Sequence, residues 1–175
     1  CISSRPSAMG LDNWHTDEFA WLTLQAYQCL ADLLNGIEEG APWPEGTTKA
    51  RSAFLSKDVD ATTDPMAYRI LLLMAVLYRR WATLRLRNLS EWIESWACEE
   101  MFAGVQGRGA EDGWYSISID LELAKEMEEE YAGAAVDIHK CFDQLISELI
   151  YEVLEQAGMP KKVLNAYRSL QEGLR

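Results

Sequence analysis

The sequence lacks paired cysteines and any long apolar segment. Its four cysteines are scattered over 175 residues without a CxxC pair, which argues against a zinc site and against a disulfide framework. Free cysteine is usually a small buried residue, so we expect reduced thiols in a reducing compartment. The most apolar run, Ile70–Leu77, is followed closely by Arg79 and Arg80. It is too short for a membrane span, so we expect no membrane association.

The chain start also lacks two features. The first residues, Cys1–Arg5, contain neither an initial Met nor an apolar signal core. This start predicts a fragment of a longer reading frame. A length of 175 residues suits one ordinary domain or part of a larger one.

Basic residues are scarce overall but cluster in one segment. The chain has 16 Lys and Arg against 28 Asp and Glu, for a net charge of −12. That balance argues against indiscriminate nucleic-acid binding, which depends on Lys and Arg. Between Thr48 and Arg87, however, eight basic residues accompany three acidic ones, so the local charge is +5. One phosphate-facing segment in an otherwise acidic body would fit this asymmetry.

Hydrophobic periodicity predicts an α+β chain that is mostly helical. Helices are expected over residues 17–39, 73–96 with a possible break at Asn88 or Ser90, 112–131, 141–156, and from Pro160 onward. Short strands are expected over residues 52–57, 67–71 and 133–138. The third strand is apolar on both faces until Asp137, which suits the buried centre of a sheet. No strand candidate follows Ile138, so we expect the sheet to be incomplete within this chain.

Asp137 stands where the third predicted strand gives way to a helix. A carboxylate at a strand end costs free energy unless a cation compensates its charge. Mg²⁺ prefers one or two carboxylates together with substrate phosphates. A carboxylate that caps the following helix is equally compatible with this position.

The residues around Asp137 resemble a known motif. Asp137, Lys140, Phe142 and Asp143 have the spacing of the first catalytic motif of reverse transcriptases, particularly those of non-LTR retrotransposons. Upstream segments resemble the fingers of that family in the family's order: Trp43-Pro44, Phe54–Lys57, Pro65–Leu71, Leu77–Arg79 and Gly107–Asp112. Downstream, the family's Gly-x-Pro helix break is matched by Ala157–Pro160 with Val163 and Leu164. The resemblance covers about residues 43–170, which leaves residues 1–42 as an N-terminal helical extension before a partial polymerase domain, residues 43–175.

The resemblance implies the fingers and first part of the palm of a right-hand polymerase that carries out two-metal nucleotidyl transfer. It implies that Asp137, helped by the Ile138 carbonyl, binds Mg²⁺. Phe142 would exclude a ribose 2′-hydroxyl, and Lys57 and Arg69 would contact the incoming deoxynucleoside triphosphate. The implied partners are an RNA template and a DNA primer.

Three arginines are weaker candidates for template or primer contacts: Arg79, Arg80 and Arg108. For the first two, a solvated helix face is the simpler interpretation.

Two features depart from the family. Ile70 replaces the proline that usually follows the fingers arginine, and the second catalytic motif, an aromatic-Ala-Asp-Asp hairpin, is missing from the sequence. We therefore expect the chain to be inactive without the remainder of the polymerase domain C-terminal to it. The alternatives are a non-catalytic α+β interaction module or decayed retroelement remnant, and a related palm polymerase that makes RNA.

Overall fold

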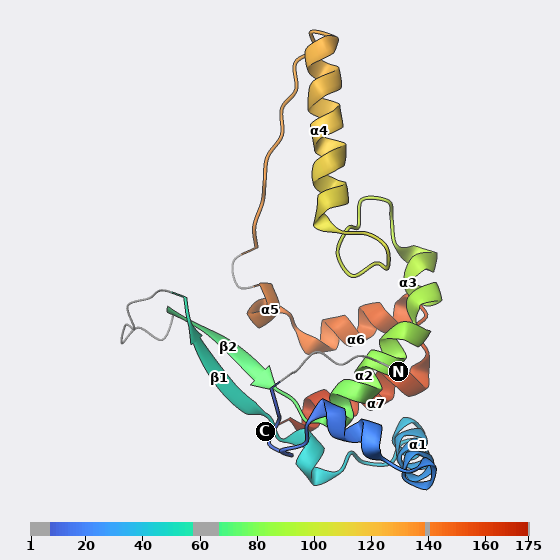
Figure 1. The fold of residues 1–175 in the computed structure, drawn as a ribbon. Helices are drawn as coiled ribbons and strands as arrows, with labels where there is room; N and C mark the ends of the chain where they lie inside the picture. Colours follow the sequence, from blue (N-terminus) through green and yellow to red (C-terminus); the bar gives the residue numbers. More distant parts are fainter. Residues whose placement is uncertain (1–7, 58–66, 139–140, 175) are drawn as a thin grey trace. The chain divides into compact units, whose positions relative to one another are not determined.

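The computed structural model describes residues 8–57, 67–138 and 141–174 (Figure 1). These residues are mostly helical, with one two-stranded antiparallel sheet, which confirms the predicted α+β class. The chain divides into two compact units. Unit 1 comprises Cys1–Leu86 and Pro160–Arg175, and unit 2 comprises Arg87–Met159.

Unit 1 begins with two helices where the sequence predicts one. The 3-10 helix η1 (Thr16–Trp21) ends before a new helix, α1 (Leu24–Glu38), begins. The break arises at Thr23, which has extended backbone angles and accepts a hydrogen bond from Ala26 N on its hydroxyl at 3.2 Å. Such an N-cap satisfies a helix donor that otherwise lacks a partner, so it favours a fresh helix start.

The two strands of unit 1 form a hairpin that confirms the first two predicted strands. Strand β1 (Arg51–Ser56) follows the short 3-10 helix η2 (Glu45–Thr48) and pairs antiparallel with β2 (Tyr68–Leu73). Arg51 pairs with Leu73 at one end of the register. The polar turn predicted at residues 58–65 lies outside the described residues.

The long predicted helix after the hairpin is broken, as the sequence allows. Helix α2 (Val76–Asn88) and helix α3 (Ser90–Trp96) are separated by Leu89. The last helix, α7 (Lys161–Gly173), begins after Pro160 and confirms the predicted C-terminal helix.

The core of unit 1 joins distant parts of the sequence. Helix α7 contacts α1, and the indole Nε1 of Trp43 donates a hydrogen bond to the Ala166 carbonyl at 2.8 Å. Most of the buried apolar side chains of this unit come from the end of α1, the hairpin flanks, α2 and α7: Ile37, Trp43, Ala75, Val76, Trp81, Val163, Leu164, Ala166 and Leu170. Residues 43–48 and the C-terminal helix therefore share one core.

Unit 2 contains three further helices: α4 (Ala110–Glu126), α5 (Cys141–Gln144) and α6 (Ser147–Gln156). Helix α4 confirms a helix in the predicted region, although it ends at Glu126. The single helix predicted for residues 141–156 is divided into α5 and α6. No described helix in either unit combines the length and apolar character required to cross a membrane.

The predicted buried strand at residues 133–138 is wrong. These residues form no strand, and the side chains of Val136 and Ile138 are 88% and 63% exposed. A central strand needs hydrogen-bonding neighbours on both sides, and the described sheet contains only β1 and β2. Gly133, Ala134 and Ala135 also offer little side-chain area to bury.

Candidate functional site

The hairpin of unit 1 gathers basic side chains on one face. Side chains alternate between the two faces of a strand, and cross-strand partners share a face. By the observed register, Leu55 pairs with Arg69, and Arg51 pairs with Leu73 on the same face. Lys57 continues that face, because its backbone N–H donates to the Ala67 carbonyl at 2.8 Å, directly after the last strand pair.

Lys57 and Arg69, the two predicted triphosphate contacts, are therefore diagonal neighbours. Side chains in this relationship start roughly 7–8 Å apart at the backbone, a separation that two long side chains can bridge to hold one phosphate chain. Both residues are exposed. No acidic residue shares the register positions of this face, so its local potential favours anions.

Asp137, the predicted metal ligand, lies in the extended segment of unit 2. It is exposed, and no hydrogen bond or ion pair joins its carboxylate to another described residue. Mg²⁺ accepts carboxylate and backbone carbonyl oxygens as donors, the two atom types that the resemblance assigns at Asp137 and Ile138.

Other ligands for a metal are not gathered around Asp137. Among residues 8–57, 67–138 and 141–174, no three His, Cys, Asp or Glu side chains form a group that could hold a metal ion. The next predicted site residue, Phe142, falls within α5, and its side chain lies outside what the structure describes. Lys57 and Arg69 belong to unit 1, whereas Asp137 and Phe142 belong to unit 2.

Two of the three arginines considered for template contact, Arg80 and Arg108, make contacts inside the fold. Arg80 donates from Nη2 to the Thr16 carbonyl at 2.7 Å, and its guanidinium lies 5.6 Å from the centre of the Phe19 ring. Arg108 donates from Nη1 to the Glu99 and Met101 carbonyls, each at 3.3 Å, and to the Cys98 carbonyl. Arg79 is half-buried on α2. The Arg80 hydrogen bond holds the start of η1, and the Arg108 hydrogen bonds hold the loop that follows α3.

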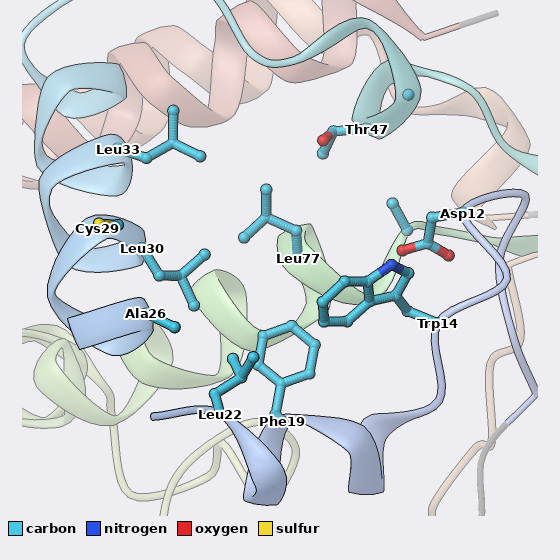
Figure 2. Close-up of a pocket in the computed structure, with 12 residues that line it drawn as sticks. Asp12, Trp14, Phe19, Leu22, Ala26, Cys29, Leu30, Leu33, Thr47 and Leu77 are labelled. Carbon is cyan, nitrogen blue, oxygen red and sulfur yellow. The ribbon is translucent and has the colours of Figure 1, made fainter. Parts of the chain in front are cut away.

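A hollow in unit 1 was not expected from the sequence. Side chains of α1 line one side of it, and Trp14, Asp12 and Thr47 lie on the opposite side (Figure 2). Asp12 also caps α2, since its Oδ2 accepts a hydrogen bond from Val76 N at 2.7 Å. The apolar periodicity of α1 was visible in the sequence, but the approach of Asp12 to a residue 64 positions later leaves no local pattern.

Comparison with known proteins gives no family assignment: neither a family model nor a curated protein matches this sequence.

Proposed function

We propose that this chain is the fingers and first palm segment of an RNA-directed DNA polymerase of the non-LTR retrotransposon type. The observation that carries the proposal is the hairpin register, in which Lys57 and Arg69 share one exposed face. The motif resemblance assigns both residues to the incoming triphosphate, and a shared face is what that role requires.

The basic face would bind and orient the deoxynucleoside triphosphate. Arg69 can grip phosphate oxygens with its planar fork, and Lys57 adds a compact positive charge. During transfer, the primer 3′-hydroxyl attacks the α-phosphorus, and negative charge develops on the leaving pyrophosphate. Cations placed beside that group stabilise the charge as it forms.

Asp137 would hold Mg²⁺ together with the Ile138 carbonyl. Its carboxylate is exposed and has no partner among the described residues. Bound Mg²⁺ would supply charge stabilisation for the attacking and leaving oxygens. Because this chemistry needs further carboxylates, we expect activity only when the chain is joined to the C-terminal remainder of the palm. Phe142 would select against a ribose 2′-hydroxyl.

The competing function is a non-catalytic interaction module that descends from such a polymerase. Its support is the exposed apolar surface: Phe54 on the hairpin is 63% exposed, and Trp114 on α4 is 69% exposed. Exposed apolar patches commonly mark protein contacts. The polymerase proposal accounts for the same exposed surface, because the remainder of the polymerase domain would contact it.

Primer extension by the reading frame that contains this chain and its C-terminal continuation tests the proposal. Asp137→Asn should abolish Mg²⁺-dependent extension of a DNA primer on an RNA template, whereas Asp120→Asn, an exposed control on α4, should not. Lys57→Ala and Arg69→Ala should each raise the KM for deoxynucleoside triphosphate by roughly tenfold or more, since hydrogen bonds to charged groups contribute about 1.5–3 kcal/mol. Lys49→Ala, which alters an exposed ion pair outside the hairpin, is the matched control.

Three results would count against this RNA-directed DNA polymerase. Full extension by Asp137→Asn would remove the metal-ligand assignment. A continuation without an aromatic-Ala-Asp-Asp motif would favour the interaction module, and preference for ribonucleotides would favour an RNA-making palm polymerase.

A further inference from the structure

The hollow of unit 1 has the size of a ligand site. Its volume is about 590 Å³, and pockets that bind small molecules span roughly 300–1,000 Å³. It lies outside the hairpin face and the Asp137 segment, so it has no part in the proposed polymerase chemistry.

Most of the lining is apolar. Leu30 and Leu33 point from helix α1 into the hollow (Figure 2). On another wall, Trp14 and Phe19 form an edge-to-face pair with ring centres 5.4 Å apart. Leu33 is 39% exposed, so the described residues leave part of the α1 apolar stripe uncovered. An apolar molecule in this hollow would remove that surface from water.

The opposite side of the hollow carries a carboxylate with unused hydrogen-bonding capacity. Asp12 Oδ2 accepts from Val76 N, whereas Oδ1 is buried and has no hydrogen-bond partner among the described residues. Thr47, which is buried, lies on the same side of the hollow as Asp12 (Figure 2). Asp12 lines the hollow with only one of its two oxygens hydrogen-bonded to a described residue, so its negative charge is incompletely compensated on this side.

We propose that this hollow binds an amphiphilic amine, with its apolar body along the α1 stripe and its protonated nitrogen at Asp12. A positive head group complements the charge of the Asp12 carboxylate, while a carboxylate head group would be repelled. Small-molecule sites usually combine an apolar cavity with a small number of polar groups that fix the orientation of the ligand.

A set of three probes with one chain length tests the head-group selectivity. Dodecylamine, dodecanol and dodecanoate are titrated below their aggregation concentrations, and binding is followed by calorimetry at pH 7. We expect one-to-one binding of dodecylamine that is roughly tenfold or more tighter than that of the other two. Equal affinity for all three would overturn the proposal.

Cys29 provides a second measurement that needs no substitution. This free, exposed cysteine lines the hollow, while free Cys98 belongs to unit 2. Dodecylamine should slow maleimide labelling of Cys29, read by peptide mass spectrometry, and leave Cys98 unchanged. Unprotected Cys29 at saturating amine would refute the site. Protection that instead rises with protein concentration, without the amine, would assign the hollow to a second copy of the chain and also refute it.

Paired variants separate site binding from general attraction to an acidic protein. Asp12→Asn retains an acceptor for Val76 N and should weaken amine binding roughly tenfold. The control, Asp32→Asn, removes an exposed charge on α1 that Gln28 hydrogen-bonds at 2.9 Å. Equal weakening by both variants would refute the proposal.

A second pair changes volume instead of charge. Ala26→Trp should fill the hollow and abolish both binding and Cys29 protection, whereas Ala31→Trp adds the same side chain at an exposed α1 position outside the lining. Unchanged binding by Ala26→Trp would overturn the proposal even if Asp12→Asn failed to fold.

Discussion

Trp81 donates a hydrogen bond from its indole Nε1 to Oε1 of Glu38 at 2.7 Å. The same carboxylate receives two hydrogen bonds from Arg85, including Nη2 to Oε2 at 2.9 Å. Only 9% of the Glu38 side chain is exposed. A carboxylate at this depth is tolerated because three donors replace its water, and the cluster fastens the end of α1 to α2.

Replacing Glu38 should therefore destabilise unit 1 markedly. Glu38→Ala leaves Arg85 and the Trp81 indole without their acceptor, and we expect a loss of about 2–4 kcal/mol in the free energy of unfolding, near the range for broken buried ion pairs. Urea denaturation measures it. In a double-mutant cycle with Arg85→Ala, the two losses should be non-additive; simple additivity would show that the pair is not coupled. Glu45→Ala, in an exposed pair with Lys49, should leave the midpoint unchanged.

Tyr78 makes the stability of unit 1 sensitive to alkaline pH. Its ring packs against Trp43 and Trp81, with ring centres 5.9 Å away in each case. Burial raises the pKa of the Tyr78 phenol, and nearby Tyr167 raises this pKa further, while a hydrogen bond with Gln171 acts in the opposite direction. The folded state thus retains the phenol proton at a pH where the unfolded chain releases it.

The sign of the effect follows from that difference. The contribution of Tyr78 is fully present below the unfolded phenol pKa of about 10 and is lost as pH rises through the higher folded pKa. Between pH 9 and 12 the stability of Tyr78→Phe should therefore fall less steeply than that of the parent. Tyr115→Phe, which removes an exposed phenol, is the control. Parallel pH profiles for parent and Tyr78→Phe would contradict the prediction.

Local sequence patterns are sufficient for the hairpin and for α7. Residues 52–57 and 67–71 are rich in apolar residues and flank a polar turn sequence, so each strand can be recognised alone. Pro160 marks the start of α7 because its fixed φ suits a helix entrance. In both places, neighbouring residues carry the information that determines the structure.

Other features depend on contacts that the sequence pattern does not reveal. An apolar stripe runs through residues 17–39, but the Thr23 hydroxyl starts a new helix within it. The segment 133–138 has the composition of a buried strand but pairs with no described strand. Periodicity reports which residues could be buried, and only tertiary partners decide whether they are.

The same division applies to the candidate sites. The shared face of Lys57 and Arg69 follows from strand alternation once the hairpin register is known. The unsatisfied Asp12 oxygen requires knowledge of which groups surround it after folding, because its carboxylate caps a helix that begins 64 residues later.

Gly36 in α1 and Gly40 just beyond its end have equally open surroundings, so they test the effect of backbone conformation alone. A Cβ added to Gly36 or to Gly40 would meet no atom within 4 Å, so an alanine at either position adds no clash. Gly36 lies inside the helix, whereas Gly40 lies beyond its end with a φ of +108°. There the Gly40 N–H donates to the Ile37 carbonyl at 3.0 Å, and the Ala41 N–H donates to the Gly36 carbonyl at 2.9 Å. This pair of hydrogen bonds is a Schellman helix ending.

The same substitution should consequently have opposite effects four residues apart. Gly36→Ala should raise the free energy of unfolding by about 0.5–1 kcal/mol, because alanine loses less backbone entropy in a helix. Gly40→Ala should lower it by about 1–2 kcal/mol, because a Cβ disfavours left-handed backbone angles. Urea denaturation of the two variants beside the parent measures both changes. If both substitutions shifted the free energy of unfolding in the same direction, the left-handed backbone conformation at Gly40 and the helix ending built on it would be refuted.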